Sequence, residues 1–138
     1  MRFQGRVYKD GRHWLAEVPV FDALTQGRSR REALEMIGDW FVTLANRTRF
    51  SVDIYPSGTD EFEVGSTDSR TMISLLLQRQ RHKSGLSLAQ AAARLGVKSR
   101  NAYARYERGA SVPTVEKLDE LLRAVAPGSN IVLRQSAA

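Results

Sequence analysis

The chain has 138 residues, 42% of them hydrophobic and 26% charged, values typical of a folded protein with one or two domains. It contains no cysteine, and its two histidines, His13 and His82, are far apart in the sequence, so neither a disulfide framework nor a zinc site is expected. The net charge of +6 is unevenly distributed: residues 1–66 carry 9 Lys and Arg against 10 Asp and Glu, whereas residues 67–138 carry 12 against 5. The second half should therefore be attracted to polyanions such as nucleic acid.

Alternating apolar residues open the chain and predict strands over 2–8 and 13–18, joined by the Asp-Gly turn signal at 10–11. In the first strand the side facing the core would carry Phe3, Gly5 and Val7. Pro19 should end the pairing of the second strand. A short third strand is expected over 23–26.

A helix is predicted from Ser29 to Ala45, because Ser29 and Glu32 have the spacing of a capping box. An apolar stripe follows at helical spacing, and one helix can bury such a stripe only against a sheet. Alternation then predicts a hairpin of strands over 50–55 and 61–64. The stripe consists of Ala33, Leu34, Met36, Ile37, Trp40, Phe41, Leu44 and Ala45.

The first half, residues 1–65, is thus expected to be a small α+β domain, an antiparallel sheet with one covering helix. Residues 65–67 form a candidate linker, and residues 69–134 are expected to form an all-α domain. Asp68 or Ser69 should cap the first helix of that domain. The predicted helices span 70–83, 88–95, 100–108 and 115–125, the last capped by Thr114.

The stretch from Gly85 to Gly109 has the pattern of a helix-turn-helix. Ser87 and Ser99 are suitable N-caps, and Gly96 and Gly109 stand where helices commonly end in a left-handed residue. Tyr103 and Tyr106 stand three positions apart and should face one side of the second helix. The remaining face of the second helix would carry Arg100, Asn101, Ala104, Arg105 and Arg108, and arginine and asparagine suit base edges and phosphates.

The apolar run Ile131-Val132-Leu133 predicts a short strand near the end of the chain. A single exposed strand has unpaired backbone groups, so we expect it either to pair with another chain or to pack on its own domain.

The first half, especially VYKDGRHWLAEVPVFDALTQGRSRREALEMIGDWF, resembles HicB-family antitoxins, and the second half resembles a Cro-type helix-turn-helix domain. The resemblance rests on the turn before an aromatic strand ending in Val-Pro, the Gln-Gly dipeptide and the Glu-Ala-Leu helix. It implies a partial ribonuclease H-like fold for residues 1–65. It further implies an antitoxin that masks a HicA-like, mRNA-cleaving toxin and represses its own operon as a dimer joined through the C-terminal domain.

The same resemblance assigns roles to residues of the second half. Arg81 and Glu107 match a structural ion pair between two helices, and Arg100, Asn101 and Arg105 match positions that reach base edges. The predicted DNA-binding set, with candidate phosphate contacts included, is Arg94, Lys98, Ser99, Arg100, Asn101, Arg105 and Arg108.

The sequence also leaves open a function other than that of an antitoxin. A stand-alone regulator could sense a small ligand in a pocket near Trp14 and Trp40. An enzyme is not expected, because the acidic residues of the first half do not predict a convergent site and no glycine-rich phosphate loop is present. We expect no cofactor and no metal. A cytoplasmic protein without a membrane span is expected, since no apolar run approaches the ~20 residues that a span needs.

Overall fold

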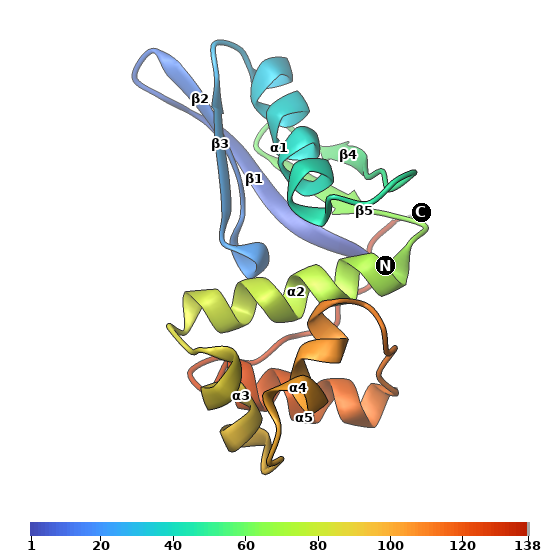
Figure 1. Ribbon diagram of the computed structural model, residues 1–138. Coiled ribbons are helices and arrows are strands. Elements are labelled where there is room, and N and C mark those ends of the chain that lie inside the picture. Colours follow the sequence, from blue (N-terminus) through green and yellow to red (C-terminus); the bar gives the residue numbers. More distant parts are fainter. Residues whose placement is uncertain (138) are drawn as a thin grey trace.

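Five antiparallel strands form a single sheet in the first half of the chain (Figure 1). The computed structural model describes residues 1–137. The sheet has the order β3-β2-β1-β5-β4 and confirms the predicted antiparallel sheet, while its ribonuclease H-like character stays a prediction. The strands are β1 (Arg2–Asp10), β2 (His13–Val18), β3 (Ala23–Gly27), β4 (Asp53–Ser57) and β5 (Glu61–Gly65).

Helix α1 (Arg30–Ala45) covers one face of this sheet, as its apolar stripe predicts (Figure 1). At its start the hydroxyl of Ser29 accepts a hydrogen bond from the amide of Glu32 at 3.1 Å. The Glu32 side chain does not return the second bond of the predicted capping box within the described chain. Ile37 and Phe41 are fully buried against the sheet, but Met36 is 43% exposed and lies outside the core.

The predicted strand over 50–55 is displaced toward the C-terminus. Strand β4 begins only at Asp53 and continues through Pro56 and Ser57, residues expected to form a turn. A proline is tolerated here because β4 is at the edge of the sheet, where one side of the backbone has no strand to pair with. Phe50 precedes the strand and is buried.

The second half is helical, with α2 (Ser69–Lys83), α3 (Leu88–Leu95), α4 (Arg100–Glu107) and α5 (Val115–Val125). These bounds confirm the four predicted helices, and each end lies within one residue of its predicted position. Asp68 and Thr114 act as the N-caps of α2 and α5, accepting hydrogen bonds from backbone amides at 3.0 and 3.1 Å.

Helix α2 lies between the sheet and the helices α3–α5 (Figure 1). Its sequence predicts a face on which apolar and polar residues are mixed, yet α2 is buried on nearly all sides. The buried residues include the polar Thr71, Ser74 and Gln80. On the sheet side it packs against η1 (Pro19–Phe21), where the Gln80 amide donates to the Val20 carbonyl at 2.6 Å. One continuous core cluster therefore runs from the sheet through α2 to α5.

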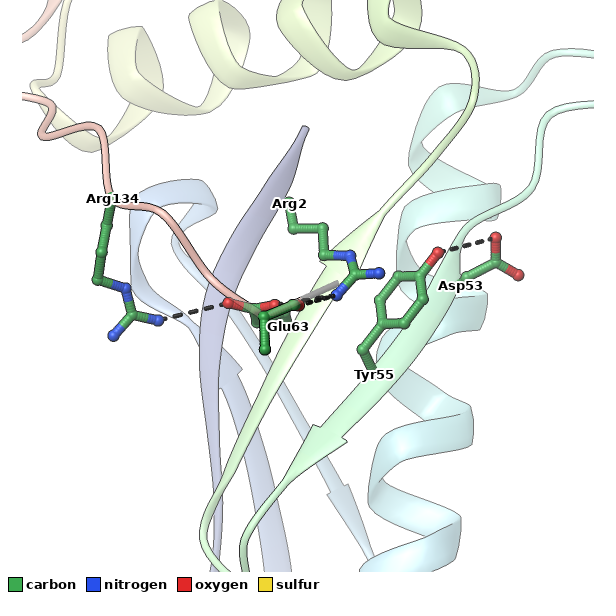
Figure 2. Close-up of polar contacts among 6 residues, drawn as sticks. Arg2, Asp53, Tyr55, Glu63 and Arg134 are labelled. Carbon is green, nitrogen blue, oxygen red and sulfur yellow. Dashed lines mark hydrogen bonds and ion pairs between the residues drawn. The ribbon is translucent and has the colours of Figure 1, made fainter.

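The C-terminal segment forms no strand within the described residues of this single chain, so the predicted pairing of Ile131–Leu133 with another chain stays a prediction. The segment instead returns to the uncovered face of the sheet, where Arg134 and Arg2 lie on either side of Glu63, each at 3.4 Å (Figure 2). Arg2 also stacks on Tyr55 at 3.5 Å from the ring centroid. Val132 and Leu133 are left 81% and 92% exposed.

Candidate nucleic-acid interface

Helix α3 is held at both ends by local hydrogen bonds. Ser87 and Gln90 form a complete capping box, in which the Ser87 hydroxyl accepts from the Gln90 amide at 3.0 Å and the Gln90 side chain accepts from the Ser87 amide at 2.8 Å. At the other end, the amides of Gly96 and Val97 donate to Ala93 and Ala92, a Schellman motif with Gly96 at φ +80°. These bonds fix where the turn begins.

Helix α4 is also held at both ends by local hydrogen bonds. Ser99 caps its start by accepting from the Asn101 amide at 3.2 Å. At its end, the amides of Gly109 and Ala110 donate to Tyr106 and Arg105, with Gly109 at φ +70°. The short turn between Gly96 and Ser99 therefore joins two helices with defined ends.

The exposed face of α4 carries three polar side chains at i, i+4 and i+7, namely Asn101, Arg105 and Arg108. Residues at this spacing share one side of a helix. Arg100 is exposed at the first turn, and Lys98 and Ser99 are exposed just before it. We call Arg100, Asn101, Arg105 and Arg108 the recognition surface. An arginine and asparagine surface can form bidentate hydrogen bonds with guanine and adenine.

The buried face of α4 confirms part of the prediction and corrects another. Tyr103 is fully buried and Tyr106 is 8% exposed, so the two share one side of α4, as expected. The sequence predicts that Ala104 faces outward, but Ala104 is only 4% exposed and belongs to the packed side. Its small side chain lets α4 lie close to its neighbours.

The predicted ion pair between Arg81 and Glu107 is present and mostly buried. The guanidinium of Arg81 donates from Nε and Nη2 to the two oxygens of Glu107 at 2.7 and 2.9 Å, and the side chains are 12% and 7% exposed. A third bond joins Arg81 Nη1 to the Leu86 carbonyl at 2.8 Å. The pair thus ties α2 to α4 and to the connection before α3. Its hydrogen bond and charge raise the pKa of Arg81.

Tyr103 lies beside this pair, and its hydroxyl has no hydrogen-bond partner among residues 1–137. Burial raises the pKa of Tyr103 strongly, and the Glu107 carboxylate raises it further. The phenol is therefore neutral over the physiological range.

Arg94 is the one predicted phosphate contact with a clear intramolecular role. Its Nε donates to the Ala124 carbonyl at 2.7 Å, in the last turn of α5. A cation at a helix C-terminus stabilises the helix dipole and satisfies a free carbonyl. We therefore leave Arg94 out of the interface proposed below.

Two residues that the sequence did not single out lie at the C-terminal end of α4. Arg47, from the connection after α1, donates to the Arg108 carbonyl, and Arg70 of α2 donates to the Gly109 carbonyl at 2.9 Å. No local pattern could have indicated them, because Arg47 is 61 residues from its partner.

Residues 1–137 contain no group of three or more His, Asp or Glu that could hold a metal ion. Trp14 and Trp40 both pack against the core cluster, and Trp40 lies edge-to-face on Phe41 at 4.9 Å between ring centroids.

Comparison with known proteins agrees with the geometry of the second half. Residues 73–126 match the family model described as a helix-turn-helix domain, a span that includes α3, α4 and α5 and most of α2. The second half of the chain is thus a helix-turn-helix domain, a class of fold that binds DNA and regulates transcription. No curated protein matches the chain. Among the described residues, no helix has the length and apolar character that crossing a membrane requires.

Proposed function

We propose that this protein is an antitoxin that represses its own operon through α4 and neutralises a HicA-like toxin through its α+β half. The observation that carries the DNA-binding part is the recognition surface, an exposed arginine and asparagine face on a helix whose opposite side is held by the Arg81–Glu107 pair. Arg100, Asn101 and Arg105 would read base edges. Lys98, Ser99 and Arg108 would contact phosphates.

Single substitutions test this assignment on a duplex that the parent protein enriches from a random-sequence pool. Arg100→Ala or Asn101→Ala should cost about 1–3 kcal/mol of binding and relax the sequence preference at one position. Lys98→Ala or Arg108→Ala should lower the affinity for all DNA sequences alike. Each should also reduce the salt slope, the slope of the logarithm of the binding constant against the logarithm of the salt concentration, by about 1. The control is Arg12→Ala, which removes the same charge from the exposed turn between β1 and β2. Parent-like binding by Arg100→Ala and Asn101→Ala would refute the base contacts.

The antitoxin part of the proposal is supported by the uncovered face of the sheet. We call this the outer face; helix α1 covers the opposite one (Figure 1). Strand alternation places Phe62 and Val64 in the core and five acidic side chains on the outer face, where the basic side chains are Arg2 and Arg6 of β1 and Arg134 of the C-terminal segment. A protein that binds mRNA must itself be basic to neutralise phosphates, and an acidic sheet face is complementary to it. The acidic side chains are Asp10, Glu17, Asp53, Glu61 and Glu63.

Charge reversal separates the outer face from the rest of the domain. The protein should co-purify from its native host with a small basic partner, and Glu61→Lys should weaken that complex at least tenfold because like charges face each other across the contact. Asp39→Lys, an equal reversal on the exposed side of α1, should leave it intact. If no small partner co-purifies, or both variants behave alike, the antitoxin role or its surface is wrong.

We further propose a dimer joined through the C-terminal domain, because operators read by such domains consist of two half-sites. Val112 and Val115, 57% and 85% exposed beside the start of α5, are candidate contacts, as are Val132 and Leu133. Sedimentation of the full chain determines whether it is a dimer at micromolar concentration.

A further inference from the structure

The guanidinium of Arg47 joins the α+β half to the end of helix α4. Arg47 lies in the connection between α1 and β4, outside the residues that match the helix-turn-helix family model. It is half-buried, and it donates from Nη2 to the Arg108 carbonyl and from Nη1 to the Thr71 hydroxyl at 2.7 Å.

Thr71 extends this contact to the start of α2. Its side chain is almost completely buried, and its hydroxyl donates to the Asp68 carboxylate at 2.6 Å while accepting from Arg47. Asp68 also caps α2 through the Thr71 amide. Each group in the series has its polar partner, so the guanidinium is fixed in position by α2 as well as by α4.

The end of α4 is where this contact matters. The free carbonyls at a helix C-terminus carry a partial negative charge, and a cation there is stabilising. Arg47 and Arg70 together satisfy the carbonyls of Arg108 and Gly109, the two residues that follow α4. Arg105 of the recognition surface is in the last turn of α4, and Arg108 is the residue directly after it.

We propose that Arg47 is a positioning residue for DNA recognition, which holds the C-terminal turn of α4 at the angle at which Arg105 and Arg108 meet DNA. The proposal rests on the proposed DNA binding through α4. It makes the α+β half contribute to DNA recognition through the position of α4. A small change in the end of α4 moves the long side chains of its last turn and leaves the capped first turn in place.

Gly109 offers a second way to displace the guanidinium without removing it. A Cβ at this position would be 2.5–3.0 Å from three atoms of the Arg47 guanidinium, so Gly109→Ala must push the flexible side chain aside. The φ of +70° adds a backbone strain that does not depend on Arg47. A double-mutant cycle separates the two effects.

The experiment measures affinity and salt slope for the full chain on the duplex enriched by the parent protein. Arg47→Ala should weaken binding about three- to tenfold, and in the Arg108→Ala background it should leave the salt slope unchanged, because Arg47 itself contacts no phosphate. Arg47→Lys should restore part of the affinity. Arg49→Ala is the matched control: Arg49 is exposed, two residues away, and forms no hydrogen bond or ion pair within residues 1–137. Gly109→Ala should cost less affinity in the Arg47→Ala background than in the parent.

Each alternative outcome has a distinct meaning. A salt slope that falls by about 1 when Arg47→Ala is added to Arg108→Ala would make Arg47 a phosphate contact and overturn the positioning role. Binding equal to that of Arg49→Ala, or additive effects of Arg47→Ala and Gly109→Ala, would overturn it as well. If Arg47→Ala does not fold, the affinity and salt slope of the folded variants Arg47→Lys and Gly109→Ala test the positioning role. Failure of the parent to select any duplex would refute the proposed function itself.

Discussion

Replacing Arg81 by alanine is the sharpest test of how the helical half is built. The substitution removes both hydrogen bonds to Glu107 and the bond to the Leu86 carbonyl, and it leaves a carboxylate that is only 7% exposed without its cation. Breaking a buried pair in this way costs about 3–5 kcal/mol, because the remaining charge is uncompensated. A domain of this size has a total stability of about 5–15 kcal/mol, so the variant should lose a large part of it.

Urea denaturation followed by circular dichroism gives the free energy of unfolding, and the same data from Arg31→Ala give the comparison. Arg31 pairs with Glu35 on the surface, with side chains 90% and 61% exposed, and such a pair contributes only about 0.3–0.5 kcal/mol. Replacing Arg81 and Glu107 together by apolar residues should recover much of the loss, since no buried charge remains. If Arg81→Ala destabilises no more than Arg31→Ala, the buried pair does not hold α2 and α4 together.

Three further predictions follow from individual contacts. Tyr103→Phe should leave the free energy of unfolding unchanged or raise it by up to about 1 kcal/mol, because the buried hydroxyl has no partner to lose; a clear destabilisation would contradict this. The pKa of Asp68 is lowered chiefly by the Thr71 hydroxyl, so the stability it contributes is present above its unfolded value of about 4 and is lost as the pH falls through the lower folded value. The stability advantage of the parent over Asp68→Asn, measured by denaturation from pH 6 to pH 2, should therefore shrink below about pH 4, and a constant difference would exclude the linkage. If Val132 and Leu133 join two copies of the chain, the double variant Val132→Asp/Leu133→Asp should sediment as a monomer and not as a dimer. An unchanged dimer would place the contact elsewhere, and Val115→Asp then tests the start of α5 as that contact.

Elements with strong local signals were predictable, because their hydrogen bonds close within a few residues. Helix α3 has its cap at Ser87 and its left-handed residue at Gly96, and both ends fall where the sequence places them. Strand β2 likewise alternates without interruption up to Pro19. The sequence pattern predicts β4 too early, because it does not reveal that this strand is at the edge of the sheet, where Pro56 can be accommodated.

The features that could not be predicted depend on contacts between distant residues. The burial of α2 on nearly all sides reflects a layer on each side of it, and its own pattern cannot report the second layer. Arg47 and Arg94 look like ordinary surface cations, yet each reaches a carbonyl at or near the end of another helix. The ion pair of Arg81 and Glu107 was anticipated only through resemblance to a known domain, since residues 26 positions apart have no local pattern in common.

The position of α2 has a consequence for how the two halves influence each other. Arg79 and Gln80 donate to the carbonyls of Phe21 and Val20 in η1, while Arg81, the next residue, binds Glu107 of α4. Three consecutive side chains of α2 thus bind both η1 and α4. The first of these, η1, joins two strands of the sheet. Any force that shifts η1 must act on a helix that is already fixed to α4, because both contacts are direct hydrogen bonds. If a partner binds the sheet, its effect on DNA affinity should pass through α2, and weakening the η1 contacts by Gln80→Ala should reduce that coupling more than it reduces either binding event alone.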